Sequence, residues 1–131
     1  MSGPPPAMII LHVGTNDLVS TDMFSMRQRI KLFLHETRLL YPKSLLIWSE
    51  ILPRVFYFGA NTQKAMEKKR RKINKWAEYQ ATKLGCQVLH HPQFQQSKLH
   101  LFRYDAVHLS VEGNMAFREN IQLCIRSLLL S

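Results

Sequence analysis

Apolar positions along the chain follow two alternating patterns. Short, nearly continuous apolar runs occupy 8–13, 45–48 and 86–89, and such runs are typical of strands that are covered on both faces. Segments 22–41 and 62–84 carry apolar residues at helical spacing, and a third segment of this kind begins after Ser110. The order β-α-β-α-β-α predicts an α/β fold with right-handed crossovers and a parallel sheet.

Polar and helix-breaking residues mark where the helices begin and end. Asp22 is expected to cap the first helix and Pro42 to stop it, Asn61 or Thr62 to cap the second, and Gly85 to follow its end. The faces expected to be buried are Met26, Ile30, Phe33, Leu34, Thr37 and Leu40 in the first helix, Met66, Ile73, Ala77, Gln80 and Leu84 in the second, and Phe117, Ile121, Cys124, Ile125 and Leu128 in the third.

Length and composition predict a single domain over 8–131, preceded by a flexible, proline-rich lead at 1–7. No apolar run approaches the ~20 residues that cross a bilayer, and the N-terminus does not resemble a signal peptide. Cys86 and Cys124 have no metal-binding or redox spacing, so we expect free thiols. These features predict a cytoplasmic or nuclear protein without membrane association.

Candidate chemistry gathers where the predicted strands end, because functional groups in open α/β sheets collect at the carboxyl ends of the strands. Gly14 allows a sharp turn, Thr15 lies within it, and the Asn16 amide could donate to an oxyanion. Asp17 is expected to accept backbone N–H bonds. The alternative is a strand-to-helix turn in which the asparagine and aspartate make only local hydrogen bonds.

A second cluster lies before the last helix, where Asp105 precedes His108 by three residues. At this spacing the carboxylate can reach the imidazole, fix its tautomer and stabilise its protonated form. The alternative is a histidine that merely sits beside a helix cap. Two such clusters in this chain order favour a catalytic interpretation over either one alone.

These two motifs resemble a known family. HVGTNDL (12–18) and DAVHLSVEGN (105–114) are similar to the third and fifth conserved blocks of the SGNH hydrolases, also called GDSL-type esterases and lipases. ILPR, KAMEKKRRKINKWA and LFRYDAVHLS resemble the branch carried by vertebrate mobile elements. The resemblance implies a three-layer α/β/α flavodoxin-like sandwich over about 8–129. It also implies that Asn16 is an oxyanion-hole donor, His108 the general base and Asp105 its orienting acid.

The chain departs from the family at the nucleophile. The family serine lies in a Gly-Asp-Ser motif ahead of the Gly-x-Asn-Asp strand, and that motif is absent from these 131 residues. Ser2, Ser20, Ser25 and Ser49 lie in other contexts, and Ser110 is expected to cap a helix. We therefore expect an ester-hydrolase-like protein that lacks its first β-α unit and is inactive alone, acting on an ester only if a missing segment completes it. The uncharged strand at 8–13 would then be a sheet edge that self-associates or binds a partner strand.

Net charge suggests a different function. The chain carries 18 Lys and Arg against 9 Asp and Glu, giving +9, and Lys64, Lys68, Arg71 and Lys75 recur near one face of the 62–84 helix. The alternative function is therefore a nucleic-acid-associated module of mobile-element origin that binds through this helix. Against it, Trp76 and Tyr79 do not form a stacking platform. Glu67 could also pair with Arg71, so that the helix face is simply solvated.

Histidines raise the question of a metal site. His90, His91 and His100 lie close in sequence, but adjacent strand residues point to opposite faces and no carboxylate or thiol completes the set. His12 and His35 are expected to be an ordinary strand residue and a helix-surface residue. We therefore expect neither a metal nor a cofactor.

Overall fold

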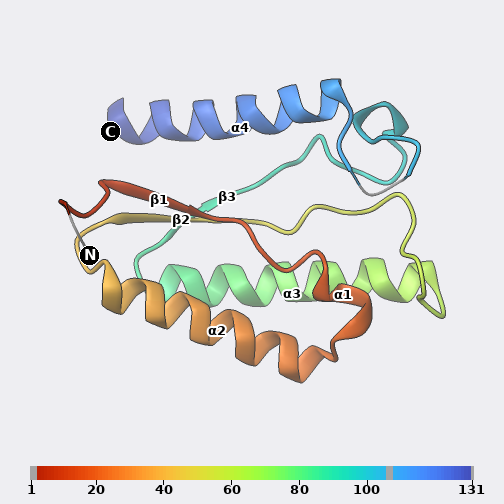
Figure 1. The fold of residues 1–131 in the computed structure, drawn as a ribbon, viewed down its shortest axis with the longest axis horizontal. Helices are drawn as coiled ribbons and strands as arrows, with labels where there is room; N and C mark the ends of the chain where they lie inside the picture. The colour runs from red at the N-terminus through yellow and green to blue at the C-terminus, as the bar shows by residue number, and fades with distance from the viewer. Residues whose placement is uncertain (1–2, 106–107, 131) are drawn as a thin grey trace.

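The computed structural model describes residues 3–105 and 108–130, and it places a parallel sheet between helices (Figure 1). The elements, in chain order, are β1 (Met8–Leu11), α1 (Asp17–Ser20), α2 (Met23–Leu40), β2 (Leu45–Ser49), α3 (Gln63–Lys83), β3 (Gln87–Leu89), the 3₁₀ helix η1 (Leu99–Leu101) and α4 (Val111–Leu130). In Figure 1, α2 and α3 lie on one side of the sheet and α4 on the other. The fold is thus a three-layer α/β/α arrangement, as expected.

The sheet has the order β1-β2-β3 and is parallel throughout. Leu11 pairs with Trp48, and Ser49 pairs with Leu89. This register aligns the carboxyl ends of all three strands, which confirms the predicted rim. Strand β1 ends two residues earlier than the predicted 8–13 because the backbone leaves the sheet before the turn at Gly14, whose φ is +108°.

The main core lies between the sheet and the helices α2 and α3. Met26, Ile30 and Leu34 of α2 and Ile73 and Ala77 of α3 are buried there, as predicted. Two members of the predicted α2 face are not: Phe33 is 37% exposed and Leu40 is 73% exposed. Helical spacing identified the buried side correctly, but these two positions lie beyond the part that α3 and the sheet cover.

Helix α4 packs less completely than predicted. Its expected core residues are only half-buried, namely Phe117, Ile121, Cys124, Ile125 and Leu128. The fully buried residues of α4 are Gly113 and Asn120. Over its face of the sheet, α4 is the only α-helix among the described residues (Figure 1), and its main neighbours there are η1 and β3.

The predicted caps are confirmed. Asp22 Oδ1 accepts the Ser25 N–H at 2.8 Å, Thr62 Oγ1 accepts the Ala65 N–H at 3.1 Å, and Ser110 Oγ accepts the Gly113 N–H at 3.0 Å. Gly85 follows α3 with a φ of +76°. Two short elements were not predicted, because α1 and η1 span only four and three residues and show no apolar period.

Part of the predicted N-terminal lead contacts the sheet. The Pro6 carbonyl accepts the Ser44 hydroxyl at 2.5 Å and the Ala7 carbonyl accepts the Leu45 N–H at 2.9 Å. Residues 1–2 of the lead, 106–107 of the predicted polar loop and the terminal residue 131 lie outside the described residues. Within the described ranges, no helix is long and apolar enough to cross a membrane.

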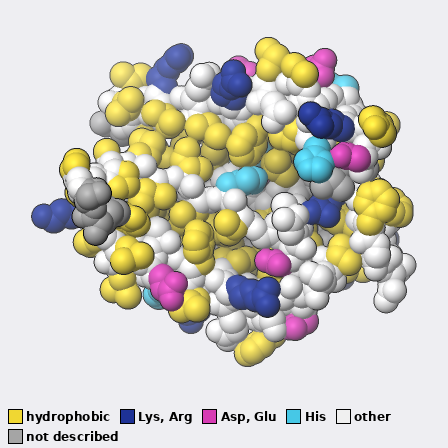
Figure 2. Space-filling view, in the orientation of Figure 1, with side chains coloured by type: hydrophobic (Ala, Val, Ile, Leu, Met, Phe, Trp, Pro, Cys, Tyr) yellow, Lys and Arg dark blue, Asp and Glu magenta, His cyan; other side chains and the backbone are white. Residues whose placement is uncertain are grey.

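Strand β1 is an edge of the sheet. Met8, Ile9 and Ile10 are half-buried, and Val13 just beyond the strand is 40% exposed. Figure 2 shows hydrophobic side chains gathered across the middle of this face, where Figure 1 places β1 in front of β2 and between α4 and α2. The chain therefore presents an apolar, uncharged edge strand.

Candidate functional site

The turn after β1 places Asn16 beside an arginine from another loop. Gly14 is required in this turn, because a Cβ on it would lie 2.9 Å from Ile51 Cδ1 in a backbone conformation that favours glycine. Arg54 Nη2 donates to Asn16 Oδ1 at 2.8 Å, and Arg54 Nε donates to Thr15 Oγ1 at 3.4 Å. Because the amide oxygen of Asn16 is engaged, its NH₂ group remains to donate to a ligand. The Asp17 carboxylate lies 3.6 Å from Arg29.

Side chains of α3 anchor the loop that carries Arg54. Asn74 accepts the Ile51 N–H at 2.8 Å and donates to the Ile51 carbonyl at 3.0 Å. The Tyr57 hydroxyl donates to Glu67 at 2.7 Å. Burial, aided by the hydrogen bond to Glu67, raises the pKa of Tyr57 to about 12, so this donor stays protonated. Glu67 also accepts from Arg70 Nη2 at 2.5 Å. The loop is therefore held at both ends.

The second predicted cluster forms as expected. Asp105 Oδ2 lies 2.7 Å from His108 Nδ1, and Asp105 Oδ1 accepts the His108 backbone N–H at 3.0 Å. An antiparallel bridge between Phe102 and Leu109, together with the Arg103 N–H bond to the His108 carbonyl at 2.7 Å, closes the base of this loop. The carboxylate thus fixes the imidazole through Nδ1 and leaves Nε2 to act as a base.

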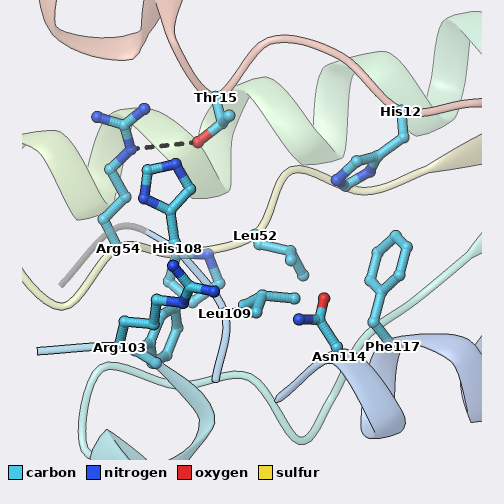
Figure 3. Close-up of a pocket in the computed structure, with 11 residues that line it drawn as sticks. His12, Thr15, Leu52, Arg54, Arg103, His108, Leu109, Asn114 and Phe117 are labelled. Carbon is cyan, nitrogen blue, oxygen red and sulfur yellow. Dashed lines mark hydrogen bonds between the residues drawn. The ribbon is translucent and has the colours of Figure 1, made fainter. Parts of the chain in front are cut away.

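One residue of each predicted cluster lines a pocket of about 430 Å³, whereas Asn16 and Asp105 lie outside its lining. Thr15 of the first cluster and His108 of the second both line it, and Figure 3 shows both beside the Arg54 side chain. His12 and Phe117 line the opposite end, with Leu52 and Leu109 between the two ends (Figure 3). The volume falls in the range of small-molecule sites, which is about 300–1,000 Å³.

Sequence analysis missed a buried chain of polar groups behind this pocket. Ser49 Oγ lies 2.9 Å from His12 Nδ1 and 2.7 Å from His91 Nε2. His91 Nδ1 accepts from Asn120 Nδ2 at 3.0 Å, and Asn120 also exchanges two hydrogen bonds with Gln93, at 2.6 and 2.9 Å. His12, Ser49 and His91 each lie at or just beyond the end of a different strand. The aligned strand ends were the signal that could have grouped them.

Hydrogen-bond directions along this chain set the tautomer of His12. Because the Asn120 NH₂ donates to His91 Nδ1, the neutral His91 ring carries its proton on Nε2 and donates it to Ser49. The Ser49 hydroxyl then donates to His12 Nδ1, which leaves the His12 proton on Nε2. Burial, with a smaller contribution from nearby His12, lowers the pKa of His91 to about 4, and burial also lowers the pKa of His12. The hydrogen-bonded side chains of His12, Ser49 and His91 are therefore uncharged at physiological pH.

The buried serine is not placed to react with a substrate. Ser49 is 0% exposed and His91 is 2% exposed, and the Phe117 ring stacks on His91 with centroids 4.7 Å apart. Ser110 Oγ donates to the His100 carbonyl and caps α4. Among the described residues, no serine hydroxyl is hydrogen-bonded to His108.

The remaining candidate residues are distributed as follows. Lys64, Lys68, Arg71 and Lys75 are all exposed on α3. Glu67 lies 3.7 Å from Arg71, as expected, but its carboxylate is mainly held by buried partners, which sequence analysis did not predict.

The imidazole rings of the three histidines that raised the metal question have no partner in common. His90 lies near Glu50 and Glu78, at 3.2 and 3.5 Å, whereas His91 belongs to the buried chain behind the pocket. His100 is the exposed middle residue of η1. The described residues contain no group of three or more His, Cys, Asp or Glu arranged to hold a metal ion.

Solved structures share the fold of this chain. A GDSL-like lipase from Bacteroides thetaiotaomicron aligns with a TM-score of 0.72 and 19% identity, covering 94% of this chain and 63% of the lipase. The esterase domain of the ORF1 protein of the zebrafish ZfL2-1 retrotransposon aligns with a TM-score of 0.67 and 23% identity, covering 88% of this chain and 70% of that domain. No family model and no curated protein sequence matches the chain.

In both alignments the matched region covers a larger share of this chain than of the solved structure. The chain is matched almost along its whole length, yet it spans less than two thirds of the lipase. Together with the parallel sheet and the two rim clusters, these alignments confirm the expected resemblance at the level of the fold: the chain has the fold of the GDSL-type hydrolases, over part of their length.

Proposed function

We propose that the chain forms the base and oxyanion side of an acyl-ester hydrolase site whose nucleophilic serine comes from another segment. The observation that carries the proposal is the Asp105–His108 pair at 2.7 Å on the same pocket as the turn that holds Asn16. In this site His108 Nε2 takes the proton of the attacking hydroxyl, and Asp105 stabilises the imidazolium that forms. The Asn16 NH₂ group donates to the developing oxyanion.

Arg54 has a positioning role in this proposal. An asparagine amide can rotate by half a turn about its terminal bond, which would exchange its donor and acceptor. The charged Arg54 guanidinium can only donate, so it selects the orientation in which Asn16 Oδ1 faces the loop and the NH₂ group faces outward. The loop anchors on α3 therefore support the oxyanion donor.

The chain alone is then expected to be inactive. In a catalytic triad, loss of the serine costs on the order of 10⁶ in turnover. The test is to incubate the purified 131-residue chain with a fluorophosphonate probe and a p-nitrophenyl ester, with His108→Ala as the matched control. We expect no labelled serine and equal background hydrolysis by both proteins. A strong, phosphonate-sensitive activity that His108→Ala abolishes would contradict the proposal.

A second candidate function is nucleic-acid binding through α3. It is favoured by the exposure of all four predicted cations and by the excess of Lys and Arg over the whole chain. Counterion release predicts binding that weakens steeply with salt. A filter-binding series with single-stranded RNA should lose affinity in a Lys68→Gln/Arg71→Gln variant but not in a Lys31→Gln/Lys43→Gln control. No binding at low salt would exclude this function.

A further inference from the structure

The pocket beside His108 combines cations with apolar walls. Leu52, Leu109 and Phe117 supply apolar surface, while Arg54 and Arg103 bring two guanidinium groups to the His108 end (Figure 3). Neither Asp nor Glu occurs among the described residues that line it. The pocket is thus apolar at one end and positively charged at the other.

Both arginines retain donors for a ligand. Arg54 uses Nε and Nη2 on Thr15 and Asn16, and its Nη1 makes no hydrogen bond within the described part of the chain. The Arg103 side chain is exposed, and no hydrogen bond or ion pair to its guanidinium is formed by residues 3–105 or 108–130. The nearest carboxylate in sequence, Asp105, already accepts two hydrogen bonds from His108.

The opposite end of the pocket favours an uncharged group. His12 is neutral there, because the buried chain through Ser49 uses its Nδ1 and burial lowers its pKa. The Phe117 ring lies against it, with centroids 5.0 Å apart. A ligand that fits the whole pocket therefore needs an apolar body at this end and an acceptor-only anionic group at the arginine end.

We propose that this pocket binds carboxylates attached to an apolar group, held by Arg54 and Arg103. The inference rests on the proposed function for its catalytic consequence, namely that the preferred substrate is an ester that also carries a carboxylate. Guanidinium–carboxylate pairs are short, charge-assisted and often bidentate, so they distinguish a carboxylate from a neutral amide of the same shape.

The test compares 4-phenylbutyrate with 4-phenylbutanamide, which differ only in the charged group. Titrations followed by amide chemical shifts measure affinity and locate the ligand, with Leu109 and Phe117 reporting on the pocket. We expect the anion to bind about tenfold more tightly than the amide, the scale of one good charge-assisted bond. Arg103→Gln should reduce that preference to about twofold or less, whereas the exposed Arg118→Gln on α4 should retain it.

Several outcomes would overturn the inference: equal affinities for the two probes, shifts that avoid Leu109 and Phe117, or a preference that survives in Arg103→Gln. Binding of the carboxylate needs no nucleophile, so its outcome is separable from that of the proposed function. Anion preference without hydrolysis in a completed enzyme would sink the function alone. Hydrolysis without anion preference would sink this inference alone.

Discussion

At the residue scale, one glycine determines how closely the last helix approaches the site. A Cβ at Gly113 would lie 1.9 Å from the Leu101 carbonyl oxygen and 3.1 Å from Leu109 Cβ. Leu101 and Leu109 belong to the segments that close the His108 loop, and the Ser110 N–H donates to that same Leu101 carbonyl at 3.0 Å. The position of His108 therefore depends on the absence of a side chain on the first turn of α4.

The substitution Gly113→Ala should destabilise the protein by about 2–4 kcal/mol, because backbone atoms must move to admit the methyl group. The sign of the change in unfolding free energy identifies the cause, since Gly→Ala within a helix otherwise stabilises by about 1 kcal/mol. Urea unfolding measures the change, and Arg118→Ala on the exposed side of the same helix serves as the control. A Gly113→Ala variant as stable as the wild type would show that α4 does not contact η1 this closely.

A second residue-scale prediction concerns pH. The pKa of His91 falls from 6.5 to about 4 on folding, mainly because the ring is buried and also because of nearby His12 and His90, while Glu50 opposes the shift. Between these two values the unfolded state binds a proton that the folded state does not. The free energy of unfolding is therefore highest above pH 6.5 and decreases as the pH falls toward 4. The loss should approach about 3 kcal/mol.

Urea unfolding at several values of pH measures this dependence. His91→Gln should flatten the slope between neutral and mildly acidic pH, although His12 will leave part of it. His35→Gln, on the exposed surface of α2, should leave the slope unchanged. A wild-type protein equally stable across that range would contradict the burial of a neutral His91.

At the scale of elements, sequence periodicity predicted the long helices and the strands, because each has a repeating apolar face. It could not predict α1 or η1, because elements of four and three residues are too short to show a repeating apolar face. It also identified the inward face of α4 but not how fully that face is covered. How fully a helix face is covered depends on neighbouring elements, and the main neighbours of α4 among the described elements are η1 and β3.

In the candidate site, contacts between residues close in sequence were predicted, and contacts between distant segments were not. The contact between Asp105 and His108 was predictable because the two residues lie three positions apart in one short motif. The contacts of Arg54 and of His12, Ser49 and His91 were missed, because the partners lie 37 to 42 residues apart in sequence. Only the strand register brings these groups together.

The free edge of β1 leads to a prediction about association. We expect the chain to self-associate at high concentration through this apolar strand, because its unpaired N–H and C=O groups can extend another sheet. Ile10→Lys places a charge on the edge and should shift the protein toward monomer in sedimentation. Leu39→Lys, at an exposed apolar position on α2, should not. A wild-type chain that stays monomeric and melts cooperatively would contradict a reactive edge.

At the scale of the whole molecule, the pieces of the site are distributed over the rim of one parallel sheet. The turn after β1 supplies Asn16, the loop after β2 supplies Arg54, and the loop before α4 supplies Asp105 and His108. The same fold occurs in a lipase and in a retrotransposon esterase domain that both extend beyond the matched region. The account therefore predicts that this chain can serve as the base side of a complete hydrolase.

The most direct measurement is ester hydrolysis by a chimera. A segment with the Gly-Asp-Ser motif that the family resemblance implies ahead of this strand would be joined ahead of β1, and cooperative unfolding would establish that the chimera is folded. The account predicts hydrolysis of p-nitrophenyl acetate that falls by about six orders of magnitude in His108→Ala and about 10²-fold or more in Asn16→Ala. A folded chimera without activity, or one whose rate is unchanged in His108→Ala, would contradict the assignment of this site.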